Sequence, residues 1–300
     1  MLSGVLLLDK PHGLSSSGAS QRVRWLLGAA KAGHVGSLDP LATGMLPVCL
    51  GEATKIAGEI VAGRKCYRFE VALGAATDTG DREGAVIETA SVPPLDEATV
   101  VATLGRFRGR QLQVPPMFSA LKRAGQPLYR LARAGIEVAR APREIEIDAL
   151  ALRALAPDAV ALEACCSKGT YIRVLASDIA RALGTCGHVR QLRRLYVAPF
   201  EREPMVTLEA LQQLVADGAP VPLLPPEAAL PGLPAVAFGP DAAARLAQGQ
   251  AVLGIDATLA GRVRLHDERG RFLGLGEADG RGAVRPRRMF VDWEARARAG

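Results

Sequence analysis

The first half of the chain alternates apolar and polar positions in a way that predicts strands separated by a helix. Residues 4–10 are almost continuously apolar and end in a Pro-His-Gly turn, which is typical of a strand. Three serines, residues 15–17, precede apolar positions at helical spacing, so we expect a helix capped by serine. Residues 45–50 predict a short buried strand, and residues 65–74 predict a strand with one apolar face.

The second half continues with both kinds of element. Residues 95–107 have the spacing of an amphipathic helix, and two strands are expected near residues 144–152 and 159–166. A glycine turn then leads to a helix over residues 170–183, whose first residue, a threonine, is the expected N-cap. One more helix is predicted over residues 207–215.

The last part of the chain differs in composition. Residues 219–238 contain six prolines, which exclude a membrane-spanning helix there and suit a linker. Residues 261–277 alternate over short stretches with turn residues between them, a pattern typical of a small β-barrel module. Residues 233–300 carry eleven arginines and eight acids, a net charge of +3. We therefore expect a separate, slightly basic unit at the C-terminal end.

Charge is distributed unevenly. The 300 residues carry 37 Lys and Arg against 31 Asp and Glu, a net charge of +6, and the pI is about 9.3. Residues 105–143 hold nine basic residues and one acid, Glu137, a local net charge of +8. Phe107, Phe118 and Tyr129 are interleaved with these charges, and this mixture favours nucleic-acid binding over a merely solvated surface.

Length and cysteine usage limit the class of protein. Hydrophobic residues make up 49% of the chain, enough for one large domain and one small one. Five cysteines show no C-x-x-C spacing, so we expect reduced, structural thiols in a cytosolic protein. The apolar stretch before Asp9 is far shorter than the core of a signal peptide.

Residues 33–55 concentrate the candidate chemistry. Asp39 precedes Pro40, which steers the aspartate away from helical geometry, and four glycines punctuate the segment. Such a loop can hold one carboxylate still at the edge of a core. Taken alone, however, Asp-Pro is more often a helix start, with aspartate as N-cap and proline at the first helical position.

Other motifs support no competing chemistry. Thr79-Gly80 after Asp78 has the D-T-G pattern of aspartic proteases, but no second D-[ST]-G exists to share a proton, so a tight turn is expected. Ser119 and Lys122 form an S-x-x-K without its S-D-N and K-T-G partners. Four scattered histidines form no metal-binding spacing, and there is no phosphate loop. We expect an enzyme that needs no cofactor.

Three stretches together carry a family resemblance: GVLLLDKP from Gly4, GHVGSLDPLATGMLP from Gly33, and KGTYIR ending at Arg173. They resemble the bacterial tRNA pseudouridine-55 synthases of the TruB type over residues 4–291. The resemblance implies an α+β fold, with a mixed, largely antiparallel sheet and flanking helices over residues 1–231. It also implies a basic RNA-gripping arm over about 105–143, and a β-barrel PUA-like RNA-binding domain over 232–300.

The resemblance also implies roles for single residues. Asp39 corresponds to the catalytic nucleophile and Arg173 to the arginine that pairs with it, an unusual position because a cation opposes the dipole at a helix start. Tyr67 corresponds to the tyrosine that packs on the target uracil. Tyr171 helps to shape the pocket, and Leu192 lines it.

Two further residues are expected near the substrate. His34 is placed to contact the RNA backbone, although a lone histidine is as often a satisfied structural group. Lys10 either contacts the RNA or supports the packing near the site. We expect a cytoplasmic monomer that acts on the T-arm of tRNA without a protein partner, and the compact length favours the stand-alone enzymes over guide-RNA-dependent relatives.

Two rival classes remain open at this point. The chain can be an RNA chaperone or binding module without catalysis, in which Asp39 is only a cap. It can also be a metal-free hydrolase that uses Asp39, since the spacing of paired carboxylates is not visible in a sequence. Two departures from the family are Ser17, where many relatives carry another residue after the serine pair, and Ser37, where Thr or Ala is usual.

Overall fold

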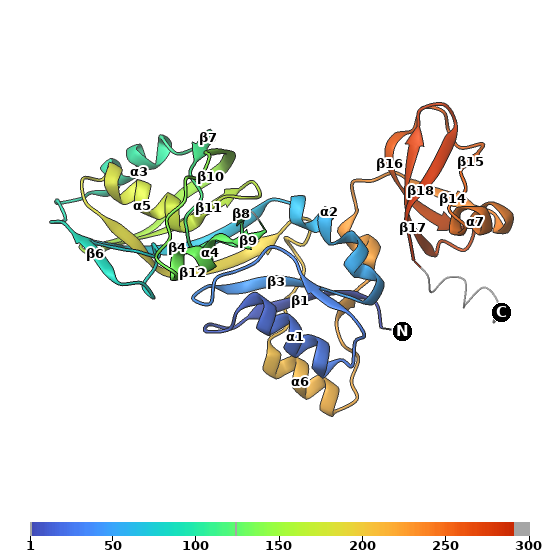
Figure 1. Ribbon diagram of the computed structural model, residues 1–300, viewed down its shortest axis with the longest axis horizontal. Helices are drawn as coiled ribbons and strands as arrows, with labels where there is room; N and C mark the ends of the chain where they lie inside the picture. Colours follow the sequence, from blue (N-terminus) through green and yellow to red (C-terminus); the bar gives the residue numbers. More distant parts are fainter. Residues whose placement is uncertain (1, 124, 291–300) are drawn as a thin grey trace.

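A nine-stranded sheet forms the centre of the computed structural model, which describes residues 2–123 and 125–290 (Figure 1). Eight strands follow the order β13-β1-β3-β12-β4-β11-β10-β7. The ninth strand, β2, pairs with β3 and is not part of this order. Neighbours are antiparallel except β12 and β3, which run parallel. The strands are β1 (Gly4–Lys10), β2 (Ala32–His34), β3 (Thr43–Leu50), β4 (Lys65–Leu73), β7 (Gly109–Gln113), β10 (Arg143–Ala156), β11 (Ala159–Cys166), β12 (Gly187–Val197) and β13 (Leu223–Leu224).

Two groups of helices cover different parts of this sheet (Figure 1). The helices α1 (Ser16–Leu26) and α6 (Leu208–Ala216) lie together and bury apolar side chains with β1 and β3. The helices α3 (Glu97–Gly105) and α5 (Ile172–Ala182) pack over the other half, against β4, β10, β11 and β12. The mixed α+β architecture predicted from the sequence is therefore confirmed.

The parallel contact between β3 and β12 joins the two halves of the sheet. Arg194 of β12 lies opposite Gly44 of β3, whose φ is +96°. A Cβ atom on Gly44 would lie 2.1 Å from the main-chain oxygen of Arg194, so only glycine permits this approach. The junction places residues 43 and 44, in the middle of the 33–55 stretch, beside β12.

Several local predictions are confirmed and one is wrong. Ser15 caps α1 by accepting a hydrogen bond from the Gly18 amide, and Thr207 caps α6 in the same way. Thr170, in contrast, does not cap α5. Its hydroxyl donates to the carbonyl of Ser167 at 3.0 Å and closes the preceding turn, and Tyr171 occupies the N-cap position.

The basic arm is shorter than the predicted span of 105–143. Gly105 ends α3, residues 109–113 form β7, and Arg143 begins β10, with which β7 pairs, so both ends of that span belong to the main body of the domain. The excursion between them covers residues 114–142 and contains β8 (Lys122–Arg123), β9 (Gln126–Pro127) and α4 (Leu128–Arg133). The density of basic residues correctly indicated this region. It could not show that some of these residues lie on the edge strand β7 and others on the segment that leaves the sheet.

The C-terminal segment forms its own five-stranded sheet, in the order β14-β16-β17-β18-β15, around a separate apolar core (Figure 1). Its elements are β14 (Ala235–Phe238), α7 (Pro240–Ala247), β15 (Val252–Leu253), β16 (Ala260–Asp267), β17 (Phe272–Asp279) and β18 (Ala283–Met289). The outer strands β14 and β15 do not pair with each other within residues 125–290, so barrel closure stays a prediction. Residues 291–300 of the predicted domain lie outside the described residues.

This C-terminal sheet contacts the first part of the chain. Leu275 and Phe290 share an apolar cluster with residues of β1 and β3 and of the 3-10 helix η1 (Gly51–Ile56). Lys55 donates to the carbonyl of Met289 at 2.7 Å. Arg262 forms an ion pair with Glu59 of α2 (Ala57–Ala62). These contacts fix the sheet to the edge of the larger unit.

The remaining elements are a ribbon of β5 (Ala75–Thr77) and β6 (Val86–Thr89) and the 3-10 helix η2 (Pro226–Ala229). None of the helices in the described residues is long and apolar enough to cross a membrane.

One expectation about the cysteines is wrong. Cys66 and Cys165 form a disulfide between β4 and β11, where they are direct partners across the strands. They lie 99 residues apart in sequence, so their pairing depends on a strand register that spacing alone does not reveal. Cys49, Cys166 and Cys186 are buried free thiols.

Candidate active site

The loop that carries Asp39 is held on both sides of the aspartate. The Ser16 hydroxyl accepts from the Leu38 amide at 2.7 Å and donates to the Leu38 carbonyl at 2.9 Å. The Pro40 carbonyl accepts from the Gly13 amide at 2.9 Å and from the Lys10 ammonium at 3.3 Å. Asp39 therefore lies in a fixed turn and is not the cap of a helix.

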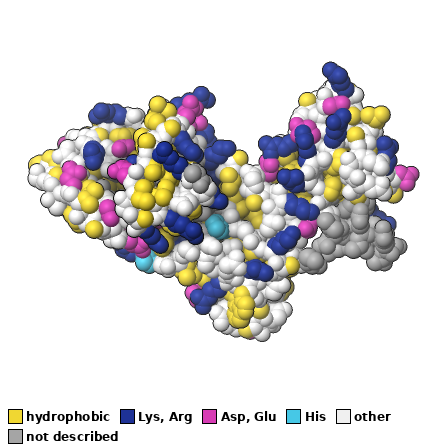
Figure 2. All heavy atoms as spheres, viewed as in Figure 1, with side chains coloured by type: hydrophobic (Ala, Val, Ile, Leu, Met, Phe, Trp, Pro, Cys, Tyr) yellow, Lys and Arg dark blue, Asp and Glu magenta, His cyan; other side chains and the backbone are white. Residues whose placement is uncertain are grey.

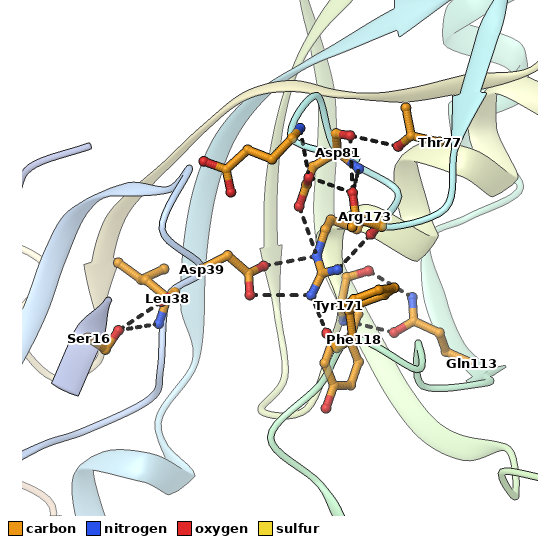
Figure 3. A network of polar contacts seen from close by, with 11 residues as sticks. Ser16, Leu38, Asp39, Thr77, Asp81, Gln113, Phe118, Tyr171 and Arg173 are labelled. Atoms are coloured by element: carbon orange, nitrogen blue, oxygen red, sulfur yellow. Dashed lines mark hydrogen bonds and ion pairs between the residues drawn. The ribbon is translucent and has the colours of Figure 1, made fainter. Parts of the chain in front are cut away.

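Arg173, from the first turn of α5, reaches this carboxylate (Figure 3). Its Nε lies 2.9 Å from Asp39 Oδ2, and its Nη2 donates to Asp39 Oδ1 at 3.3 Å. The guanidinium also donates to the carbonyls of Thr79 and Phe118, each at 2.6 Å. Several fixed acceptors thus hold the planar group in one orientation, which a single ammonium group would not match.

A second carboxylate approaches the same nitrogen of this guanidinium. Asp81 Oδ2 is 3.8 Å from Arg173 Nε, and Figure 3 shows Asp39 and Asp81 both directed toward that nitrogen. Asp81 is buried, and its Oδ1 accepts from the Thr79 hydroxyl and the Glu83 amide. The segment predicted as a simple turn therefore also supplies a charge to the site.

The protonation of Asp39 reflects opposing influences. Burial raises the pKa of its carboxyl above the ordinary value of 3.8, and the charge of Arg173 acts against that increase. The neighbouring Asp81 adds to the increase, and the hydrogen bond from Arg173 opposes it. The Asp39 side chain remains 40% exposed, so it stays open to a bound molecule, whereas Arg173 is 5% exposed.

A cavity of about 420 Å³ opens beside this ion pair. Five residues singled out from the sequence line it together: Asp39, Tyr67, Tyr171, Arg173 and Leu192. They come from a loop, from β4, from the start of α5 and from β12, so the fold brings together positions spread over more than half of the chain. The mixture of apolar walls and one carboxylate suits a flat ring with polar edges.

Tyr171 is fixed through its main chain. Its amide donates to Oε1 of Gln113 at 2.8 Å, and Nε2 of Gln113 donates back to its carbonyl at 3.2 Å. Gln113 is the last residue of β7, so the sheet edge that precedes the arm orients this wall of the cavity. Burial raises the pKa of the Tyr171 phenol.

Lys10 and His34 lie differently from the other candidates. The Lys10 side chain is fully buried and donates to the carbonyls of Pro11, Leu14 and Pro40, so it supports the loop from beneath. Burial lowers the pKa of Lys10 to about 8. These contacts favour the packing role over contact with RNA.

His34 is placed nearer to the surface. Its Nε2 is 3.0 Å from the Ser37 hydroxyl, and it lines a second hollow of about 800 Å³ on the other side of Asp39. Tyr129 and Arg133 of α4 line the same hollow, so it extends from the aspartate to the arm. Figure 2 shows Lys and Arg side chains gathered on this face over β8, β9 and α4.

No group of three or more His, Cys, Asp or Glu side chains within the described ranges is arranged to hold a metal ion. The site consists of an oriented carboxylate, a guanidinium, two tyrosines and a leucine wall. Such a set can hold a flat ring and present a carboxylate to it.

Comparison with known families defines the class of protein as a pseudouridine synthase. The profile "TruB family pseudouridylate synthase (N terminal domain)" matches residues 24–172. Two profiles of the C-terminal parts of these synthases match residues 173–230 and 234–290. The chain therefore belongs to the TruB family of pseudouridylate synthases, which are isomerases.

Curated relatives agree over almost the whole length. The chain is 48% identical over 289 residues to the tRNA pseudouridine synthase B of Aromatoleum aromaticum, covering 96% of this chain and 93% of that protein. It is 47% identical to the tRNA pseudouridine synthase B of Stutzerimonas stutzeri, covering 96% of each. Among solved structures, a crystal structure of a Cbf5-Nop10-Gar1 complex matches with a TM-score of 0.71 and 27% identity, covering 92% of this chain and 78% of that chain.

Proposed function

We propose that this enzyme converts uridine to pseudouridine at position 55 in the T-loop of tRNA. The observation that carries the proposal is the Asp39 carboxylate, which Arg173 holds at 2.9 Å at the edge of a cavity of about 420 Å³. The curated relatives of nearly equal length are named tRNA pseudouridine synthase B, which supports tRNA as the substrate.

The target base has to leave the RNA stack to reach this carboxylate. A cavity of this size accepts a single nucleoside and not a paired base, so the uridine is flipped out at a cost of roughly a few kcal/mol. Tyr67 and Leu192 then supply apolar contacts to the faces of the ring, which offset part of the lost stacking.

Asp39 acts as the nucleophile in the isomerisation. The glycosidic bond between ribose and nitrogen breaks, the uracil turns, and a carbon of the ring joins the ribose. Arg173 favours the ionised form of Asp39 and orients its oxygens, because an adjacent cation stabilises a carboxylate. Tyr67 packs on the ring and exchanges the proton at the carbon that forms the new bond.

Two parts of the chain hold the rest of the tRNA. The arm of residues 114–142 carries Lys122, Arg123, Arg130 and Arg133, of which Arg133 lines the hollow beside Asp39. The C-terminal sheet from residue 232 onward acts as a PUA-like RNA-binding domain, attached to a catalytic domain of residues 1–231. The residues of the site all come from one chain, and we propose that the enzyme acts as a monomer without a protein partner. We also propose that it works in the cytoplasm.

One assay tests this function against both rivals. The full-length protein is incubated with unmodified tRNA that carries uridine at position 55, and the products are analysed for pseudouridine, free uracil and unreacted tRNA. Pseudouridine at position 55 is expected. Release of free uracil would identify a hydrolase, and tight binding without reaction would identify an RNA-binding module.

Asp39→Asn tests the nucleophile in the same assay. It removes the charge but keeps the shape, so turnover should fall below detection while tRNA binding persists. Asp9→Asn is a matched control, since Asp9 pairs with Arg193 outside the cavity and its loss should leave turnover within about twofold. Near-normal turnover of Asp39→Asn would remove the nucleophile assignment.

A further inference from the structure

Arg194 of β12 is among the largest fully buried side chains of the protein, with 1% of its surface exposed. Its Nε donates to the Met45 carbonyl at 2.7 Å. Its Nη2 is buried and has no hydrogen-bond partner among residues 2–123 and 125–290. The residue nevertheless lines the cavity beside Asp39.

The positive charge of Arg194 is unfavourable for stability in this buried position. Arg194 forms no ion pair with a carboxylate in the described part of the chain. A buried donor without a partner costs about 1–3 kcal/mol, and apolar residues often replace buried charges without loss of stability. A side chain that served only to fill space would therefore not need a guanidinium.

The strand register places Arg194 next to Tyr67. The two residues are direct partners between the antiparallel strands β12 and β4, so their side chains leave the sheet on the same face. Both line the same cavity. Tyr67 is 8% exposed, and the charged or titratable groups that act on it are Arg194, Cys166 of β11 and Asp39 of the loop.

The catalytic loop leaves room for this arginine at two glycines. A Cβ atom on Gly44 would lie 2.1 Å from the Arg194 carbonyl oxygen, and one on Gly36 would lie 3.3 Å from its Nη1. Both glycines have positive φ angles. Gly36 therefore leaves space for the side chain of Arg194 and Gly44 leaves space for its main chain, although Met45 and Arg194 lie 149 residues apart in sequence.

We propose that Arg194 is a positioning residue that acts through Tyr67, holding its ring in the cavity and stabilising negative charge on its oxygen. This inference rests on the proposed function, because it concerns the proton that the uracil carbon must lose after it has joined the ribose. It explains why a buried guanidinium with an unused donor is kept beside a buried phenol. Burial raises the pKa of Tyr67, and Arg194 acts against that increase.

The proton transfer balances as follows. The bond between the uracil carbon and its hydrogen breaks, and its electron pair returns to the ring. The proton forms an O–H bond with the ionised oxygen of Tyr67, and the resulting phenol gives a proton back to water before the next turnover. The guanidinium offsets the negative charge on the oxygen while it exists.

Arg194→Gln separates this role from a structural one. Glutamine keeps a donor for the Met45 carbonyl but removes the buried charge. We expect the thermal unfolding temperature to stay the same or rise, while the single-turnover rate on tRNA falls by roughly 10²-fold with little change in tRNA binding. A purely structural arginine would give the opposite result, a less stable protein whose folded fraction reacts at the normal rate. Arg193→Gln, next to it and paired with Asp9, is the matched control.

A double-mutant cycle with Tyr67→Phe tests the route of the effect. If Arg194 acts through Tyr67, Arg194→Gln should change the rate less than about threefold once the phenol oxygen is gone. The same rate loss in both backgrounds would overturn the proposal. If Arg194→Gln does not fold, Arg194→Met replaces it in the cycle, because it also removes the charge and fills the buried position with an apolar side chain.

A measurement without substrate separates failure of this inference from failure of the proposed function. The ultraviolet absorption of ionised tyrosine is measured against pH in the wild type and in Tyr67→Phe, and the difference between the two curves is the titration of Tyr67. The same pair of curves is then measured in the Arg194→Gln background. Arg194→Gln should move the titration of Tyr67 to higher pH, and an unmoved titration would overturn the inference. If the wild type makes no pseudouridine, the proposed function fails while this titration still decides whether Arg194 acts on Tyr67.

Discussion

Arg173 and Asp39 lie 134 residues apart in sequence, yet the Nε of Arg173 is 2.9 Å from Oδ2 of Asp39. The arginine is nearly fully buried at the start of α5, where a cation is unfavourable with respect to the helix dipole. Its carboxylate partners, together with the carbonyls of Thr79 and Phe118, compensate for that position.

Arg173→Lys should reduce the rate strongly, although it preserves the charge. A lysine has one ammonium group and cannot reach Asp39, Thr79 and Phe118 in the same plane. The resulting shift of the carboxylate should lower the single-turnover rate by roughly 10²-fold, while the dissociation constant for tRNA stays close to normal. An unchanged rate would show that the planar pairing is dispensable. Arg181→Lys, on the exposed end of the same helix, is the control.

The pH dependence of the rate should report the Asp39 carboxyl. Burial raises its pKa above 3.8, so kcat/KM should fall with decreasing pH through a midpoint above that value, as the carboxylate takes up a proton. Arg173 acts to lower this pKa, so Arg173→Gln should move the midpoint further upward. The measurement is a rate profile under single-turnover conditions, and a downward shift in Arg173→Gln would contradict the assignment.

Most of the elements were predictable because they depend on local patterns. The strands of residues 4–10 and 159–166, and the serine cap of α1, follow from periodicity and from hydrogen bonding within a few residues. Errors arose where two local hydrogen-bonding patterns compete, or where a distant contact decides the outcome. The hydroxyl of Thr170 closes a turn and does not cap α5, and Cys66 meets Cys165 only because of the strand register.

The candidate site was likewise predicted from the sequence only in part. Asp39 and Arg173 were found by motif resemblance, whereas Asp81 was missed because an Asp-Thr-Gly-Asp segment is an ordinary turn by composition. Its only unusual property is burial beside a guanidinium, which depends on tertiary packing. Arg194 was missed because three arginines on one strand look like surface charge, and only the burial pattern distinguishes it from Arg193.

Ser16→Ala should weaken the support of the Asp39 loop. The buried hydroxyl makes two hydrogen bonds to the main chain of Leu38, so its loss leaves an amide and a carbonyl without their partner. We expect the free energy of unfolding to fall by about 1–3 kcal/mol, together with a slower single-turnover rate. Ser17→Ala is the matched control, since Ser17 is exposed and should change neither quantity. Equal effects of the two substitutions would show that the Leu38 contacts do not stabilise the loop.

Removal of the residues after Gly232 should weaken tRNA binding more than it slows the chemistry, because the residues proposed to be catalytic all precede that point. The dissociation constant and the rate at saturating enzyme are measured separately. The deletion also exposes the apolar cluster that Leu275 and Phe290 complete. Phe290→Ala in the full chain controls for that loss of packing. A deletion that abolishes the rate but preserves binding would contradict a role of this unit in RNA binding.

Lys122 and Arg123, which form β8 in the ribbon with β9, offer the sharpest test of the arm. Both side chains are exposed and belong to the same arm as Tyr129 and Arg133, which line the hollow beside Asp39, so they can contact phosphates. Lys122→Gln together with Arg123→Gln should weaken tRNA binding and reduce the slope of log affinity against log salt by roughly 1 per lost contact. The rate at saturating enzyme should remain near normal, since neither residue contacts the catalytic pair. A control with Arg153→Gln, on the outer part of β10, should leave the slope unchanged. If the double variant keeps the wild-type slope, the arm does not bind the tRNA backbone through these charges.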